Sequence, residues 1–234
     1  MIKLIFTCEH SSNRIPDEFL YLFNENKEIL ETHRAYDFGA KSIFDKFVSS
    51  YDSLGFYGLF SRLIIDLNRQ LKSKTLFSEF TYPLHPEIKK EIIEKYYNPY
   101  RKNAFEKIIS LDNSKNKLIH ISIHSFTPIF NNIVRKADIG LLYYPKSDFE
   151  RELTHNWKKE INKLNKSIKV MFNNPYHGYE DGLTTTMRNT LGMDNYAGIE
   201  LEINQRLLFD NDEREILINE LSDSFLNLLT TIPY

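Results

Sequence analysis

Two kinds of apolar pattern alternate along this chain. Short runs rich in β-branched and aromatic residues are typical of buried strands, whereas longer segments carry apolar residues at helical spacing. The short runs predict strands at residues 2–7, 63–67, 118–123, 139–143, 169–172 and 198–203, with residues 56–60 as a further candidate. The longer segments predict helices at residues 17–30, 40–51, 86–110, 149–165 and 212–230, the third of them broken into two near Asn98–Pro99.

This alternation predicts an α/β fold, in which a mostly parallel sheet is covered by helices on both faces. In such sheets ligands bind beyond the carboxyl ends of the strands, so the residues that follow each apolar run are the first candidates for chemistry. Residues 173–197 form the longest segment without a regular pattern. Segments of this length in a compact domain are often binding loops or lids.

The composition narrows the class of protein. A chain of 234 residues without a linker rich in Pro, Gly or Ser predicts a single domain over residues 1–234. Its net charge of −2, with basic and acidic residues intermixed, gives no electrostatic case for nucleic-acid binding. No apolar run approaches the roughly 20 residues that span a bilayer, and the N-terminus lacks a signal-peptide pattern. We therefore expect a cytoplasmic protein without a membrane partner. The one cysteine, Cys8, excludes an internal disulfide and a multi-cysteine zinc site.

Ionisable residues follow the first predicted strand. Glu9 offers a hard oxygen ligand and His10 a neutral nitrogen ligand, a mixture that suits zinc. The alternative is that both residues cap the next turn. Asp37 has the same ambiguity, because it could cap the helix that follows it or reach a metal ion with its carboxylate.

The predicted strand at residues 118–123 carries histidines. Strand alternation places His120, Ser122 and His124 on one face, with His124 at the carboxyl end near the expected crevice. His120 lies deeper and is interpreted as a buried, hydrogen-bonded core residue. Ser125 lacks the Gly-x-Ser-x-Gly surroundings of a nucleophile elbow, so we do not interpret it as a nucleophile.

Two arginines bracket the apolar run at residues 63–67. An arginine fork binds carboxylates bidentately and carries a permanent charge, so Arg62 and Arg69 indicate an anionic small-molecule substrate. The alternative is an arginine paired with Asp66 in a purely structural role.

The last predicted strand alternates regularly, so that Glu200 and Glu202 share one face. Two carboxylates on a central strand are costly unless they are paired or bound to a ligand. A glutamate beside a metal-activated water can act as a general base. The same pattern alone also fits an antiparallel edge strand with a solvated face.

Taken in order, six segments resemble the N-formylglutamate amidohydrolase family. They are CEHSSNRIP, YDFGA, SRLIIDLNR, NPYR, HSFTP and GIELEIN, and they run from residue 8 to about residue 204. The resemblance implies a phosphorylase/hydrolase-like fold similar to zinc carboxypeptidases and aspartoacylases, a three-layer α/β sandwich around a mixed, mostly parallel sheet. It also implies metal-dependent hydrolysis of the amide of an N-acylated acidic amino acid.

The resemblance assigns roles by position. The implied ligands of one divalent metal ion, with zinc expected, are His10, Asp37 and His124. The implied catalytic base is Glu202, which leaves Glu200 as a structural partner for an arginine. The implied substrate-binding residues are Arg62, Asn68 and Arg69.

Two departures from the pattern leave alternatives open. The wider zinc-hydrolase group carries His-x-x-Glu at its first strand, whereas this chain has Asn13 in place of that glutamate, so Glu9 rivals Asp37 as the third ligand. Branches of the family also differ at the residue before His10. The substrate could therefore be another N-acyl amino acid or a short peptide. A further alternative is a non-catalytic binding module on a decayed hydrolase fold. The complete set of implied site residues argues against it.

Overall fold

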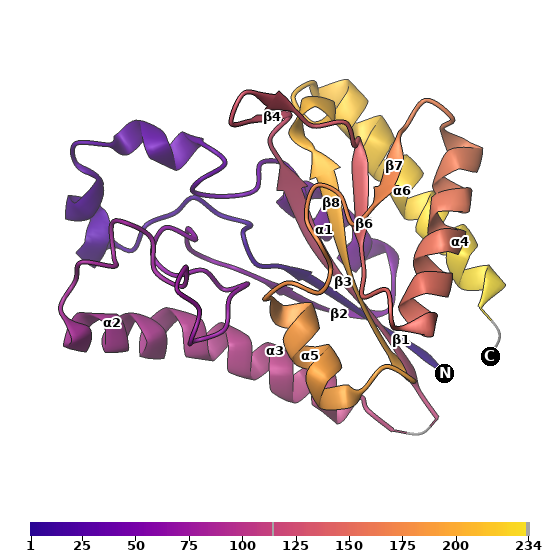
Figure 1. Cartoon of the computed structure of the whole chain (residues 1–234), viewed down its shortest axis with the longest axis horizontal. Helices are drawn as coiled ribbons and strands as arrows, with labels where there is room; N and C mark the ends of the chain where they lie inside the picture. The colour runs from indigo at the N-terminus through magenta and orange to yellow at the C-terminus, as the bar shows by residue number, and fades with distance from the viewer. Residues whose placement is uncertain (114, 233–234) are drawn as a thin grey trace.

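A six-stranded sheet forms the centre of the protein (Figure 1). The computed structural model describes residues 1–113 and 115–232. The strand order is β2-β1-β3-β8-β6-β7. Parallel pairing joins the first four strands, while β6 runs antiparallel to β8 and parallel to β7, so the sheet is mixed and mostly parallel, as predicted. The strands are β1 (Ile2–Cys8), β2 (Ser53–Tyr57), β3 (Lys117–Phe126), β6 (Ile139–Leu142), β7 (Val170–Phe172) and β8 (Tyr196–Asn204).

Helices cover both faces of this sheet and make three layers (Figure 1). One face packs against α1 (Ala40–Ser50), α4 (Asp148–Leu164) and α6 (Asn211–Thr231). Aromatic rings at the centre of that core interlock, with the centroid of Phe225 lying 5.5 Å from Phe47 and 5.0 Å from Trp157. The other face packs against α3 (Asn98–Ser110) and α5 (Leu183–Leu191).

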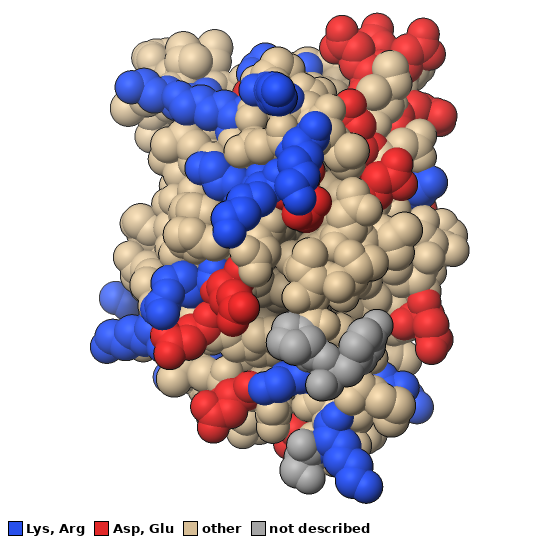
Figure 2. All heavy atoms as spheres, turned by 90° about the vertical axis from the view of Figure 1, so that its right-hand side faces the viewer, with Lys and Arg blue, Asp and Glu red and all other residues tan. Residues whose placement is uncertain are grey.

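The outer surface over α4 and α6 mixes the two signs of charge. Figure 2 shows basic and acidic side chains dispersed among a larger area of other residues on this side of the molecule. Among the described residues, no helix combines the length and the apolar character that crossing a membrane requires.

A lobe with its own apolar core lies beside the sheet, at the left of Figure 1. It consists of residues 15–36 and 63–97 and contains two 3₁₀ helices, Asp17–Phe23 and Lys27–Glu31, together with α2 (Pro86–Ile92). A π-helical turn, Ile93–Tyr97, joins α2 to α3. This lobe is important for the site because it supplies the segment that carries the two predicted substrate-binding arginines.

The predicted strand at residues 63–67 is wrong, since this segment forms turns within the lobe. Its apolar side chains, Ile64 among them, fill the core of the lobe and not a layer of the sheet. Its backbone groups form hydrogen bonds within the lobe, and not with a neighbouring strand. Asp66 N donates to Leu76 O (2.9 Å), and Thr81 Oγ1 donates to Ile64 O (3.0 Å). In the sequence, a short buried apolar run looks the same whether it forms a strand or a buried segment of turns.

Four other expectations need correction. The helix predicted at residues 17–30 is the pair of 3₁₀ helices, and the strand expected at residues 56–60 is β2, which begins and ends earlier. The break near Asn98–Pro99 is a change from π- to α-helical geometry without an end to the helix. The segment 173–197, predicted to be irregular, contains α5 and the first residues of β8.

A buried histidine–aspartate group at the carboxyl edge of the sheet

A cavity of about 160 Å³ opens where β1, β3 and β8 end. Because these strands are parallel neighbours, the residues at their carboxyl ends meet at one edge of the sheet. His10 follows the end of β1. His124 lies on β3, and Glu202 is the residue beside it on the neighbouring strand β8. The sequence-predicted site residues are brought together here: His10, Asp37, Arg62, Asn68, Arg69, His124 and Glu202 all line the cavity.

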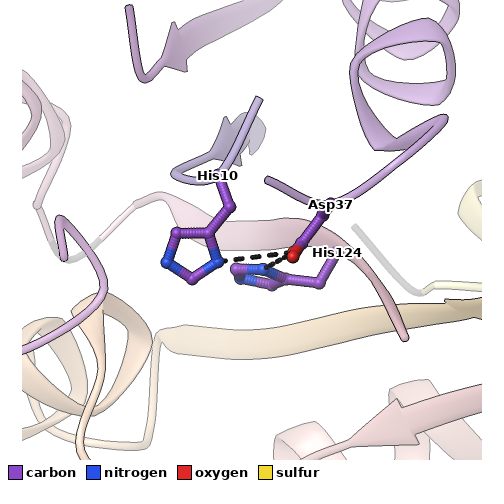
Figure 3. A group of neighbouring side chains, drawn as sticks. All are labelled: His10, Asp37 and His124. Carbon is purple, nitrogen blue, oxygen red and sulfur yellow. Dashed lines mark hydrogen bonds and ion pairs between the residues drawn. The ribbon is translucent and has the colours of Figure 1, made fainter. Parts of the chain in front are cut away.

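His10, Asp37 and His124 form a compact group (Figure 3). One potential ligand atom from each of them lies within 4.8 Å of the others, and all three residues are buried. Asp37 Oδ2 lies 2.8 Å from Nδ1 of His124 and 3.4 Å from Nδ1 of His10. Two imidazole nitrogens and one carboxylate oxygen are a donor set that fits zinc and leaves a position for water.

Local backbone geometry holds Asp37 in this place. Its N–H donates to the carbonyl of His10 (2.9 Å), which ties the two segments together. Two residues later, Gly39 adopts a left-handed conformation (φ +77°) and leads the chain into α1. A Cβ at that position would lie 2.8 Å from the side chain of Leu208, so both the turn and the close approach require glycine.

The opposite nitrogen of each histidine faces a second carboxylate. His10 Nε2 lies 2.7 Å from Asp66 Oδ1, and His124 Nε2 lies 3.3 Å from Glu9 Oε2. Each ring therefore presents Nδ1 to the group and Nε2 to a carboxylate behind it, the arrangement that orients metal-binding histidines in proteins. Glu9, the rival third ligand, stands behind His124 and lies outside the group.

Glu9 is itself fixed by two hydroxyl groups. Ser122 Oγ donates to Oε2 (2.7 Å) and Tyr100 Oη donates to Oε1 (3.1 Å). Burial opposes the ionisation of Glu9, but its contacts with His124 and Ser122 hold its pKa at about 2. Tyr100 belongs to the NPYR segment, which thus acts on the site through Glu9.

The charges within the group are mutually stabilised. Burial alone would raise the pKa of Asp37, yet the two histidines hold that pKa well below its usual range. Burial likewise opposes the imidazolium form of His124, but its bonds with Asp37 and Glu9 raise the pKa of this ring well above the usual value. A cation is therefore strongly favoured between these carboxylates, whether it is a proton or a metal ion.

Glu202 is the exception, because the effect of burial on its pKa outweighs the favourable charges of His124 and Arg135. It is 5% exposed, and its Oε2 has no hydrogen-bond partner among the described residues. Burial raises its pKa to about 8, with Asp37 and Glu200 adding to the shift. Glu200 also lines the cavity and accepts a hydrogen bond from Thr184 Oγ1 (3.1 Å); none of the described arginines is paired with it, contrary to expectation.

The bracketing arginines differ in their surroundings. Arg62 pairs with Asp66 (2.7 Å) and lies 3.7 Å from Asp37, so it supports the carboxylates of the group. Arg62 therefore makes the structural ion pair with Asp66 that the sequence left open as the alternative to substrate binding. Arg69 instead donates from Nη1 to the carbonyl of Asp181 (2.6 Å).

Asn68 stands between the lobe and the sheet. Its Oδ1 accepts from the N–H of Leu183 at the start of α5 (2.8 Å), and its Nδ2 lies 3.4 Å from His124 Nε2.

The interpretation of His120 as a core residue is confirmed, since its ring forms hydrogen bonds with Thr7 (2.9 Å) and Tyr196 (2.7 Å).

Several residues of the site escaped the sequence reasoning or received no role in it, and three of them matter most for its chemistry. Asp66 was considered only as a partner for an arginine, although it also lies behind His10. Tyr176 lies in the segment 173–197, where the absence of a regular pattern had indicated a binding loop. Arg135 lines the cavity from the segment after the β4 (Ile129–Phe130) and β5 (Ile133–Val134) hairpin, and no sequence signal marked it.

The fold and the site together define a class of protein: a three-layer α/β fold with a buried His–Asp–His group and an unpaired glutamate in a small cavity at the carboxyl edge. The model of the N-formylglutamate amidohydrolase family matches residues 2–209. The chain therefore belongs to the N-formylglutamate amidohydrolase family, and it is a hydrolase of the amide-cleaving kind.

Solved structures show the same fold. A gene product of Agrobacterium tumefaciens superposes with a TM-score of 0.83 at 24% identity, over 98% of this chain and 91% of that one. The N-formylglutamate amidohydrolase from Ralstonia eutropha JMP134 superposes with a TM-score of 0.67 at 17% identity, over 96% and 92% of the two chains. A comparison with curated proteins gave no match.

Proposed function

We propose that this protein is a zinc-dependent amidohydrolase that removes the acyl group from an N-acylated acidic amino acid, with N-formylglutamate as the type of substrate. The observation that carries the proposal is the position of an unpaired, buried Glu202 in the same small cavity as His10, Asp37 and His124. A cavity of about 160 Å³ suits a small anionic molecule and leaves little room for a polymer.

His10, Asp37 and His124 would hold the metal ion. When bound, a zinc ion polarises an amide carbonyl and makes water easier to deprotonate. The carboxylates of Asp66 and Glu9 would keep the two Nδ1 atoms turned toward that position, because Asp66 accepts the Nε2–H of His10 and Glu9 lies 3.3 Å from Nε2 of His124. Arg62 holds Asp66 in turn and keeps the charge of the carboxylates balanced.

Glu202 would move the proton. Its carboxylate accepts a proton from the water that attacks the amide carbon, and it returns this proton to the amide nitrogen as the C–N bond breaks. The products are a free amino group and a carboxylic acid. A carboxyl group whose pKa lies close to the working pH serves both steps well, and burial raises the pKa of Glu202 in the metal-free site. Arg69 would bind a carboxylate of the substrate and so orient the amide.

The test is a comparison of metal-free and zinc-loaded protein on a matched set of N-formyl and N-acetyl amino acids with acidic and neutral side chains, together with short N-acylated peptides. Release of the free amine is measured. We expect hydrolysis only with zinc, and fastest for acidic amino acids. No hydrolysis of any N-acyl amino acid by the zinc-loaded protein would refute the proposal, and equal rates without metal would refute its metal dependence.

A further inference from the structure

Arg135 is a cation of the site cavity that forms no ion pair with the described residues, and its charge favours the ionised form of Glu202 in the same cavity. It lines the cavity together with Arg62 and Arg69. Arg62 is already paired with Asp66 and lies close to Asp37. Within residues 1–113 and 115–232, Arg135 and Arg69 are the cavity arginines without an ion pair. An arginine that lines a small cavity and has no ion pair is complementary to a bound anion.

The guanidinium of Arg135 lies against three aromatic rings. Its central carbon lies 4.8 Å from the ring centre of Phe130, 5.0 Å from that of Tyr176 and 5.4 Å from that of Phe126. One Nη2 hydrogen is donated to Tyr176 Oη (2.9 Å). An arginine has five N–H donors, and the other side-chain donors of Arg135 bond to none of the described residues. A bound carboxylate would therefore find an oriented and unsatisfied fork.

Arg69 occupies a different part of the cavity wall. It is anchored to the carbonyl of Asp181 ahead of α5, whereas Arg135 follows the β4–β5 hairpin and contacts Tyr176. Two unpaired arginines from separate segments, lining one cavity of about 160 Å³, fit a small molecule with two anionic groups. A substrate with a single carboxylate would pair with only one of these two arginines.

We propose that Arg135 binds the side-chain carboxylate of an N-acylated dicarboxylic amino acid, while Arg69 binds its α-carboxylate. This inference rests on the proposed function, and it adds to that function the residue that selects an acidic side chain. Tyr176 is a positioning residue, because it accepts the hydrogen bond that orients the guanidinium.

The first experiment measures kcat and KM of the zinc-loaded protein for N-formylglutamate and N-formylglutamine, which have similar shape and differ in the charge of the side chain. Arg135→Gln should lower the preference for the glutamate compound by about 10- to 100-fold, mainly through KM, as loss of a charge-assisted contact does. Arg135→Lys should restore part of the preference, since it keeps the charge without the fork. Arg151→Gln removes an exposed arginine of α4 that pairs with Asp148, and it should change neither constant.

Two outcomes of this experiment would overturn the inference. One is an equal loss for both compounds in Arg135→Gln, since Arg135 would then only shape the rim. The other is a natural enzyme that does not distinguish the two compounds.

A second experiment separates this inference from the proposed function. Glutarate binding is measured by calorimetry with the zinc-loaded natural protein and the Arg135→Gln variant, and it needs no turnover. At least 10-fold weaker binding by the variant supports the inference even if no N-acyl amino acid is hydrolysed. Equal affinity, or no binding to the natural protein, overturns it.

Discussion

Glu9 and His124 are in contact through the side of the imidazole that faces away from Asp37. Glu9 Oε2 lies 3.3 Å from Nε2 of His124, whereas Asp37 Oδ2 lies 2.8 Å from Nδ1 of the same ring. The two carboxylates thus have different relations to any metal ion held by the group. Asp37 would share such an ion with His124, and Glu9 would set the orientation and basicity of that ring.

This difference separates two variants. Asp37→Ala should reduce the zinc content well below one per chain, because one of three ligands is lost. Glu9→Gln should still bind zinc, with an affinity lower by about 10- to 100-fold, as is usual for a residue that orients a ligand. Zinc per chain after dialysis and competition with a chelator measure both effects. The opposite result, with zinc kept in Asp37→Ala and lost in Glu9→Gln, would make Glu9 the ligand.

The two histidines should be equivalent in the same assay. His10→Ala and His124→Ala each remove a buried nitrogen ligand, so each variant should retain far less than one zinc per chain. His155→Ala is the matched control, because that histidine is exposed on α4 and stacks on Phe172. Full zinc occupancy in both site variants would exclude this metal centre.

Glu202→Gln should keep the metal and lose the reaction. The amide is nearly isosteric with the carboxyl group but cannot accept the proton of water, so kcat should fall by about 10²-fold or more. Glu200→Gln is the control on the same strand face and should lose much less, because Glu200 already bonds with Thr184. Inactivation by the Glu200 change alone would move the general base to that residue.

Arg69→Ala should weaken kcat/KM for substrates with a free α-carboxylate by roughly 2–4 kcal/mol, since a charge-assisted contact to a desolvated carboxylate is lost. Amidation of the α-carboxylate should cost the natural enzyme a comparable amount. The two losses should not add when they are combined. Equal turnover of charged and amidated substrates by the natural enzyme would contradict this role.

Burial of Glu202 should also appear in the stability of the metal-free protein. The folded carboxyl has a pKa of about 8 against 4.5 for an ordinary glutamate, so between these pH values the folded state holds a proton that the unfolded state has released. Its contribution to stability is therefore present below about pH 4.5 and is lost as the pH rises toward 8, at a rate of at most roughly 1.4 kcal/mol per pH unit. Urea unfolding at pH 5 and pH 8 should show a larger decrease for the natural protein than for Glu202→Gln. A parallel pH dependence of the two proteins would mean that Glu202 is ionised in the folded state.

The sequence by itself determined which residues reach the carboxyl edge of the sheet. The strands that precede His10 and His124 are marked by β-branched runs, and parallel pairing of such strands brings their ends together. The alternation around Glu202 likewise fixed its face, because the period of a strand is local information. For His10 and His124, the position at a strand end is sufficient to predict the place in the site, whereas for Glu202 the alternation also fits a solvated edge strand.

The tertiary structure alone decided how the remaining groups are arranged. Glu9 and Asp37 are both carboxylates near a histidine, and only the packing of β1 against β3 and the turn at Gly39 determines which nitrogen each one faces. The apolar run at residues 63–67 has the composition of a strand, yet it folds as turns because the core of the lobe buries its side chains and supplies its hydrogen bonds. Arg135 meets Tyr176, 41 residues later in the chain, in the lining of the cavity only after the chain has folded. Contacts of this kind depend on long-range packing, for which a local pattern of residues contains no signal.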